Sequence, residues 1–456
     1  MAKETTPRSG RISRRTVLTA AAASAGSSLV FGIGTAPAQV GQNRPFQGTT
    51  LNVSCWSAPY PRFLADYIPE FTEQTGIRVN YDTPGFPIYN QRVDLELSTR
   101  GSAFDVLNIT FIFTSRWIGA GWFTPLEPYI NDRNKTPAGW DFSDFLAGAV
   151  APLRDRNNVV HGVPWIADAF MSGCSRFDII RAAGMGMPDT FDELERMCAT
   201  VHNRDGVPAF VTENHFGWTW IAFLQGFGGN VFRNPPDDLM PTLDTPEAVA
   251  AAEFFAKLVR DYGPEGALSY NYDAVVAALR GGRVNYSSNN QAFLTQMGEA
   301  GSRVAATSNY SIFPKGPAGR FPGVGVHGWG IPAGSRNKDA AWEFIKWSMS
   351  KELLTRIVRE KGYGAITRQS ILDAPFFKER MTINGVDIAK IYADTINLAA
   401  AGYMRYRTVH VYPQVNTQIT QAIERVVSRQ MGARESLRQA QTNSIADLRR
   451  AGVRLQ

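Results

Sequence analysis

Residues 50–56, TLNVSCW, alternate apolar and polar side chains, which is the pattern of a half-buried β-strand. A helix is predicted over 63–75, and the strand pattern returns at 77–81, IRVNY. A second helix is predicted over 89–99, and 104–109, FDVLNI, predicts a third strand. This order of elements predicts an α/β fold with a parallel sheet covered by helices. Ligands of such sheets bind outside the carboxyl ends of the strands.

Capping residues predict further helices. Thr190 and Glu193 have the spacing of a capping box, in which each side chain bonds the other residue's backbone N–H. The segment 244–247, DTPE, places a cap, a proline and an acid where a helix begins. Two more helical patterns lie at 335–349 and, interrupted at Gly432, from 414 onward.

Residues 1–38 have the layout of an export signal. The paired arginines of SRRTVL at 13–18 precede an apolar run at 17–34, and APA at 36–38 is a small-residue cleavage site. Paired arginines are typical of the twin-arginine route. A membrane anchor is the alternative, but the run is short for a span of about 20 residues. We expect a periplasmic mature chain that begins with a polar linker at 39–48; the exact cleavage site stays open.

The composition is that of a folded protein with more than one compact region. The 456 residues exceed the usual domain length of about 100–200. The hydrophobic fraction of 44% and the aromatic fraction of 11% exclude a disordered chain. Of 47 basic and 41 acidic residues, five and one lie in 1–38, so 42 and 40 remain. This balance does not favour a nucleic-acid binder, which would show a basic face.

No sequence motif of catalysis, cofactor binding or metal binding is complete. GVGVHG at 323–328 fits G-x-G-x-x-G, but Pro332 forbids the helix that must follow, so a loop and strand are predicted. The five histidines have no partner at metal-ligand spacing, and no nucleophile elbow or phosphate loop occurs. We therefore expect no cofactor and no metal. Cys55, Cys174 and Cys198 allow at most one disulfide; three buried thiols are favoured, and a pairing stays open.

Aromatic and short polar side chains occur together in several predicted loops. Trp56 ends the first strand, and the others are VPWIAD at 163–168, HFGWTW at 215–220, YSSNN at 286–290 and HGW at 327–329. Sugars need this mixture, because rings pack on their apolar faces while carboxylates and amides bond their hydroxyls. For any single tryptophan a place in the core is the alternative. The sugar-binding hypothesis therefore depends on several such loops together.

The order of these segments resembles the periplasmic solute-binding proteins of ATP-driven importers, in the sugar-binding family that includes the maltodextrin binder. The resemblance covers nearly all of residues 49–450, and 227–267 is most similar to the polyol binders of mannitol or sorbitol type. The segments that carry it are FTEQTGIRV at 71–79, FDV at 104–106, HGVPW at 161–165, FGGN at 227–230, the helix from Asp244, YGPEGA at 262–267 and IPAGSRNKDAAW at 331–342.

The resemblance implies a two-lobe, type II periplasmic-binding-protein fold in which each lobe has a mainly parallel sheet. The N-terminal lobe would comprise 49–166 and 312–362, the C-terminal lobe 167–311 and 363–456, with a hinge of several chain crossings. The protein would be a monomer that delivers a sugar or polyol to the permease and ATPase subunits of an importer. The alternative, an exported carbohydrate-active enzyme, needs two carboxylates about 5–9.5 Å apart, and only Asp168 is a good candidate.

The resemblance also implies which side chains contact the ligand. Within 163–168, a role in holding the hinge is the alternative for the tryptophan and the aspartate. The polyol binders tend to have an aromatic residue and an acid where this chain has Ile112 and Phe113, so one hydroxyl-binding carboxylate is missing, which favours a larger or less polar ligand. The implied contact residues are Trp56, Thr110, Phe111, Trp165, Asp168, Trp218, Asn289, His327, Trp329, Tyr363 and Arg368.

Overall fold

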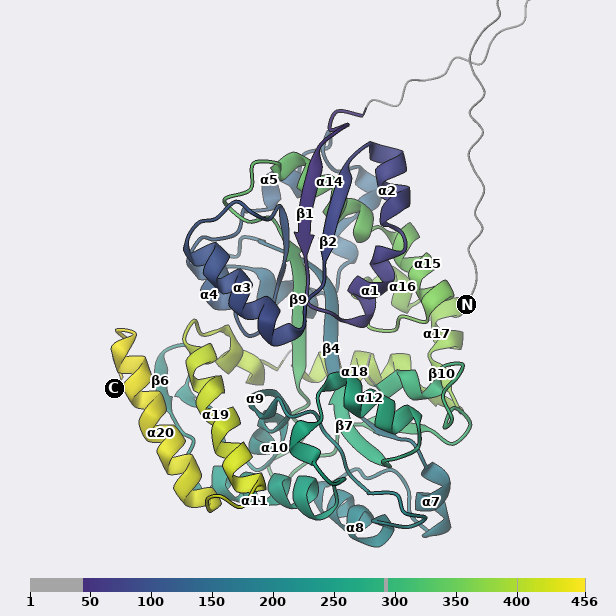
Figure 1. Ribbon diagram of the computed structural model, residues 1–456, viewed down its shortest axis with the longest axis vertical. Coiled ribbons are helices and arrows are strands. Elements are labelled where there is room, and N and C mark those ends of the chain that lie inside the picture. The colour runs from purple at the N-terminus through teal and green to yellow at the C-terminus, as the bar shows by residue number, and fades with distance from the viewer. Residues whose placement is uncertain (1–43, 291–293, 400, 456) are drawn as a thin grey trace, which may run out of the picture. The chain divides into compact units, whose positions relative to one another are not determined.

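The computed structural model describes residues 44–290, 294–399 and 401–455 (Figure 1). The predicted export signal at 1–38 and the first part of the linker lie outside the described residues. Arg44–Gln456 form one compact unit. No helix in the described part of the chain is long and apolar enough to cross a membrane.

The first three strands form the parallel sheet that the sequence predicts. β1 (Thr50–Ser54) lies between β2 (Arg78–Asp82) and β3 (Val106–Ile109), and both pairings are parallel. Leu51 and Val53, the apolar positions of the alternating pattern, are fully buried. The predicted strand–helix–strand order is therefore confirmed.

The rest of the sheet is antiparallel and depends on one long strand. β4 (Val163–Cys174) pairs with β9 (Val324–Gly330) through its first half, and with β7 (Tyr286–Asn290) and β8 (Asn309–Ile312) through its last residues. Figure 1 shows β4 and β9 side by side in the centre of the molecule. The sheet as a whole is therefore mixed, not mainly parallel as the resemblance implies. Beyond β3 its pairings are antiparallel, because β9 runs antiparallel to both β3 and β4.

The predicted single helix over 63–75 is wrong, because the chain forms two helices there. α1 (Pro59–Ala65) ends at its C-cap, Asp66, and α2 (Ile68–Thr75) begins with Pro69 in its first turn. Proline has no N–H to donate, and its ring clashes with the carbonyl four residues earlier, here that of Ala65. The break was therefore encoded by Pro69.

The other capped helices begin where the sequence predicts. Thr190 and Glu193 form the capping box of α8 (Phe191–Val201), and the Thr245 side chain accepts from the N–H of Ala248 at the start of α11 (Pro246–Asp261). The tail is two helices, α19 (Tyr412–Val427) and α20 (Ala433–Arg450). The remaining helices of the first half are α3 (Phe86–Ser98), α4 (Thr114–Gly119), α5 (Glu127–Ile130), α6 (Ala147–Val150), α7 (Phe177–Ala182), α9 (Phe216–Thr219), α10 (Ile221–Gly226) and α12 (Tyr272–Arg280). Those of the second half are α14 (Lys338–Ser348), α15 (Lys351–Lys361), α16 (Gln369–Leu372), α17 (Pro375–Arg380) and α18 (Ile388–Ala399).

Two hydrophobic cores are present, and β4 contributes to both. The first contains β1, β3 and the buried faces of α14 and α15, and it includes Met171 of β4. The second contains the buried faces of α8, α11, α19 and α20, and it includes Phe170. Because neighbouring side chains of a strand point to opposite faces, β4 joins the two cores directly. Cys55, Cys174 and Cys198 are all buried and unpaired, as expected for structural thiols.

Candidate ligand-binding site

A cavity of about 680 Å³ lies where the ends of the central strands meet the surrounding loops. Its volume falls in the range of about 300–1,000 Å³ that is common for small-molecule sites. Its walls come from the loop after β1, the start of α3, the loop after β3, the strands β4 and β9, and residues of α9, α12 and α19. The side chains that give it its chemistry are Trp56, Phe86, Asn90, Phe111, Phe113, Asp168, Glu213, His215, Trp218, Tyr272, Asn290, His327 and Asn416.

Aromatic rings cover one part of the wall. The ring centres of Phe111 and Trp218 are 4.7 Å apart, and Phe86 packs at 6.3 Å from Phe111. Trp56 lies 5.1 Å from Phe86 and 5.2 Å from His327. These distances are those of stabilising ring pairs, so the rings hold one another in place and present a rigid apolar surface to the cavity.

His327 joins this wall to the sheet beneath it. The indole Nε1–H of Trp56 donates to Nδ1 of His327 at 3.3 Å, and Asn108 Nδ2 lies 3.4 Å from the same nitrogen. Because both neighbours are donors, Nδ1 is the acceptor and the proton is on Nε2. Burial and the nearby charge of Arg407 lower the pKa of His327 to about 3, so the ring is neutral at physiological pH.

Three carboxylates line the cavity, and two of them, those of Asp168 and Glu213, come from different elements. Asp168 comes from β4 and is 6% exposed, whereas Glu213 comes from the loop before α9 and is partly exposed. Burial raises the pKa of Glu213 to about 7. Burial, and then the charges of Asp168 and Glu213, raise the pKa of Tyr272, which shows that both carboxylates act on the same stretch of wall.

A buried arginine supports the aromatic wall from behind. Arg407, in the 3₁₀ segment Tyr403–Thr408, is 5% exposed, and its guanidinium carbon lies 3.6 Å from the ring centre of Trp218 and 4.8 Å from that of Phe111. Its Nη1 donates to the carbonyl of Val324 on β9 at 2.5 Å. The stacking and the hydrogen bond together fix the two rings relative to the central strand.

The structure brings five of the predicted contact residues to the cavity: Trp56, Phe111, Asp168, Trp218 and His327. Three of the others are buried directly behind the wall. Trp165 donates from Nε1 to Asn108 Oδ1 at 2.9 Å and stacks on Tyr60, and the Tyr363 hydroxyl donates to the carbonyl of Trp165 at 3.1 Å. Trp329 is fully buried, with its ring 6.2 Å from that of Trp165. These side chains support the wall and do not line it.

Thr110 and Asn289 are also fully buried and do not line the cavity. On β7 it is the next residue, Asn290, that does so. Neighbouring side chains of a strand point to opposite faces. A shift of one residue, when the family's contact position is matched to this sequence, therefore moves the assignment from a cavity-lining side chain to one that faces away.

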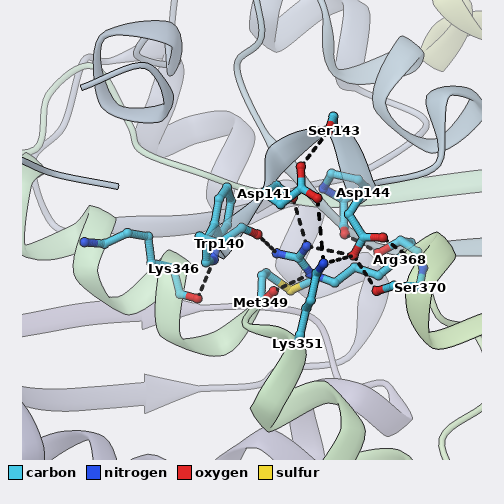
Figure 2. Close-up of polar contacts among 11 residues, drawn as sticks. Trp140, Asp141, Ser143, Asp144, Lys346, Met349, Lys351, Arg368 and Ser370 are labelled. Atoms are coloured by element: carbon cyan, nitrogen blue, oxygen red, sulfur yellow. Dashed lines mark hydrogen bonds and ion pairs between the residues drawn. The ribbon is translucent and has the colours of Figure 1, made fainter. Parts of the chain in front are cut away.

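Arg368, which was expected to contact the ligand, does not line the cavity. It lies at the centre of a buried polar cluster (Figure 2). We call it the Arg368 cluster. The guanidinium donates to Asp144 Oδ2 at 3.1 Å, to the carbonyl of Trp140 at 2.9 Å and to the carbonyl of Met349 at 2.9 Å. The Asp144 carboxylate also accepts from the Ser370 hydroxyl at 2.8 Å, and Lys351 Nζ lies 3.5 Å away. Each nitrogen of the Arg368 guanidinium therefore donates to an acceptor within the cluster.

Sequence reasoning missed several side chains of the cavity. Glu213 stands two residues before the aromatic cluster that the sequence singled out, so a polar loop followed by rings was the available signal. Asn90 is on α3 and Asn416 is on α19, where no local pattern distinguishes a cavity-facing amide from a surface one. At the two positions where the polyol binders tend to have an aromatic residue and an acid, Ile112 and Phe113 place apolar side chains in the wall.

The family comparison agrees with this geometry. The family model described as bacterial extracellular solute-binding protein matches residues 57–353, which includes the central strands and most of the cavity. The chain belongs to this family. Members of the family are binding proteins, and the fold is the type II periplasmic-binding-protein fold.

Two similar relatives are named as polyol-binding proteins, and two similar solved structures are complexes with polyols. This solute-binding protein is 25% identical to the erythritol/L-threitol-binding protein of Mycolicibacterium smegmatis over 357 residues. The aligned region covers 73% of each chain. It is 24% identical to the mannitol-binding protein of Pseudomonas aeruginosa, over 80% of this chain and 85% of that one. A solute-binding protein from Agrobacterium radiobacter in complex with ribitol has a TM-score of 0.79 and 20% identity, covering 88% of this chain and 98% of that one. A mannitol-bound protein from Agrobacterium vitis has a TM-score of 0.78 and 22% identity, covering 89% and 99%.

Proposed function

We propose that this solute-binding protein captures a sugar or polyol in the cavity and delivers it to an importer. The observation that carries the proposal is the wall itself, in which the rings of Trp56, Phe111 and Trp218 stand beside the carboxylate of Asp168 and the amides of Asn90 and Asn290. Rings bind the C–H faces of a sugar, and carboxylates and amides accept its hydroxyl protons. The relatives named for erythritol, threitol and mannitol support the same ligand class.

Capture would proceed by closure of two lobes around the ligand. We propose lobes of 49–166 with 312–362, and of 167–311 with 363–456; the first boundary then falls within β4. β4 and β9 pair along residues 163–169, so they would act as the hinge about which the lobes rotate. Ligand contacts from both sides would favour the closed arrangement, which is the hinge motion of periplasmic binding proteins.

Delivery requires export and membrane partners. We propose that the paired arginines Arg14 and Arg15 direct the folded chain through the twin-arginine route to the periplasm. The protein would act there as a monomer and present the closed, ligand-bound form to the permease and ATPase subunits of an importer. No chemical step on the ligand is proposed.

A ligand panel read by thermal unfolding tests the proposal. The mature chain would be heated with tetritols, pentitols, hexitols, monosaccharides and maltodextrins in turn. A ligand present at about 100 times its dissociation constant adds about 2.7 kcal/mol to the free energy of unfolding, which raises the midpoint by several degrees. A shift with at least one of these compounds, without its chemical conversion, is the expected result. No shift with any of them, or turnover of a bound compound, would overturn the proposal.

A further inference from the structure

The cavity offers hydrogen-bond acceptors that the protein does not use. Asn90 is 6% exposed and Asn290 is 9% exposed; both line the cavity, and the Oδ1 of each has no hydrogen-bond partner in the described part of the chain. The Oδ1 of Asn416, which also lines the cavity, has no partner there either. Buried polar atoms are nearly always bonded, so three unbonded amide acceptors in one cavity indicate a ligand that supplies donors. Both hydroxyl groups and amino groups meet this requirement.

The charges of the wall distinguish between these two kinds of donor. Three carboxylates line the cavity, from Asp168, Glu213 and Asp273, and no lysine or arginine of the described residues does. Asp273 lies 3.8 Å from Arg62 Nη1 and is compensated there. Within the described residues, the Glu213 carboxylate makes no hydrogen bond or ion pair. A neutral hydroxyl leaves such a charge uncompensated, whereas an ammonium group compensates it.

Other charged and titratable groups face this stretch of wall without neutralising Glu213. Tyr272 and Asp273 come from the start of α12, Asp168 from β4, and His215 from the same loop as Glu213. Burial and the charge of Arg407 lower the pKa of His215 to about 4, and His327 is also neutral, so neither ring supplies a positive charge at neutral pH. Arg407 itself is buried against Trp218, on the far side of the ring wall. Aromatic faces such as that of Tyr272 also favour a cation beside them.

We propose that the ligand is an amine-bearing sugar or polyol, whose protonated amino group binds the Glu213 carboxylate. This inference rests on the proposed function and narrows its ligand class. Asp168 and the unbonded amide oxygens of the wall then accept the hydroxyl protons. The raised pKa of Glu213, about 7, is consistent with a carboxylate that lacks its cation in the empty cavity. Binding of an ammonium group restores the ionised form, so a proton is released when the ligand binds below pH 7.

Matched ligand pairs test this inference. Isothermal titration would compare sorbitol with 1-amino-1-deoxysorbitol and mannitol with 1-amino-1-deoxymannitol, whose primary alkyl amines are protonated at about pH 8. In every pair that binds, we expect the amine to bind about tenfold or more tightly, because hydrogen bonds to a charged partner are the stronger ones. Glu213→Gln should abolish the difference, and Glu253→Gln, the same change at an exposed position of α11, should keep it. At pH about 6, titration in two buffers of different ionisation enthalpy should show proton release with the amine and none with the neutral partner.

The outcomes separate this inference from the proposed function. If neutral compounds bind and their amines bind no better, or if the amine preference survives in Glu213→Gln, the inference is overturned and the function stands. If no member of any pair binds and the wider panel also gives no shift, both fail. If only the amines bind, or if they bind better through Glu213, both are supported.

Discussion

Two regions of this molecule hold charged groups that are wholly or partly buried, and the partners of those groups differ. In the Arg368 cluster the Asp144 carboxylate bonds Arg368 and Ser370, and the guanidinium is shared among one carboxylate and three carbonyls (Figure 2). In the cavity wall the Glu213 carboxylate has no bond or ion pair among the described residues, and the Oδ1 atoms of Asn90 and Asn290 have no partner. The charged groups of the Arg368 cluster have partners within the protein, whereas polar atoms of the cavity wall have none among the described residues.

The difference shows why burial and charge alone do not identify a binding residue. Burial raises the pKa of Asp144, but the bonds from Ser370 and Arg368 outweigh this, and the net result is a lowered pKa. For Glu213 burial acts alone and the pKa is raised. A buried charge whose partners are all within the protein has a structural role, since removing a partner is destabilising, and a charge that lacks partners is available to a ligand. The sequence resemblance assigned Arg368 to the ligand, but its partners place it in the first group.

The largest effect should follow from breaking the Arg368 cluster. Arg368→Ala leaves Asp144 buried without its main partner, and the free energy of unfolding should fall by about 3–5 kcal/mol, measured by urea denaturation. The double variant Arg368→Met with Asp144→Leu should be less destabilised than Arg368→Ala, because no charge is left unpaired. Arg133→Ala, an exposed arginine, is the control. Affinity for the panel ligand should not change, since Arg368 does not line the cavity; a loss of affinity in a folded variant would return Arg368 to the site.

The next effect concerns the pH dependence of stability, which should come from the cavity histidines. The pKa of His327 is about 3 in the folded protein and about 6.5 in the unfolded chain, so below pH 6.5 the unfolded state binds a proton that the folded state does not. The contribution of His327 to the free energy of unfolding therefore falls by about 1.4 kcal/mol per pH unit as the pH decreases. Glu213 contributes in the opposite direction, because its raised pKa makes the folded state bind the extra proton between pH about 4.5 and about 7. His327→Gln should remove about 2–3 kcal/mol of the loss between pH about 7 and about 4.5.

The control for this prediction is His410→Gln, which changes an exposed histidine. Asp144 provides the contrast with the other region. Its pKa is lowered, so its contribution to stability is present above the ordinary aspartate value and is lost only in stronger acid. An unchanged pH slope in His327→Gln would mean that His327 does not carry the acid sensitivity.

Local signals were sufficient to predict the elements of the fold. Alternation gave the strands β1 and β2, and caps gave the starts of α8 and α11, because these features depend on neighbours in the sequence. The break between α1 and α2 was also local, and Pro69 could have revealed it. The antiparallel return of β9 was not predictable in this way, since it depends on contacts between residues more than 150 positions apart.

Within the buried strands, the sequence does not distinguish the side chains that line the cavity from those that lie behind its wall. All twelve residues of β4 are buried, so no polar alternation distinguishes Asp168, which lines the cavity, from Trp165, which does not. The same limit applies to Asn289 and Asn290 on the fully buried β7. Which buried face meets a cavity and which meets a core is set by the packing of distant elements.

A smaller effect is expected from the Asp168 carboxylate on β4. Asp168→Asn keeps the size of the side chain and removes its charge, so it should weaken ligand binding by about 10-fold to 100-fold, because charge-assisted hydrogen bonds contribute about 1.5–3 kcal/mol. Calorimetric titration with the panel ligand measures this, and Asp237→Asn, at an exposed loop position, is the control. Unchanged affinity in a folded variant would assign Asp168 to holding β4 and β9 together instead of the ligand.

The smallest effect should come from the exposed edge of the Arg368 cluster. Lys351 Nζ lies 3.5 Å from Asp144 and 3.7 Å from Asp141, but the side chain is 39% exposed, whereas Arg368 is fully buried. Exposed ion pairs contribute about 0–1 kcal/mol, and a lysine in the first turn of α15 opposes the helix dipole, which offsets part of that gain. We therefore expect Lys351→Ala to change the free energy of unfolding by less than about 1 kcal/mol in urea denaturation. Because Lys351 and Arg368 share the partner Asp144, the two variants differ mainly in burial. A loss for Lys351→Ala comparable to that of Arg368→Ala would mean that Asp144 needs both cations, and that exposure does not separate the edge of this cluster from its centre.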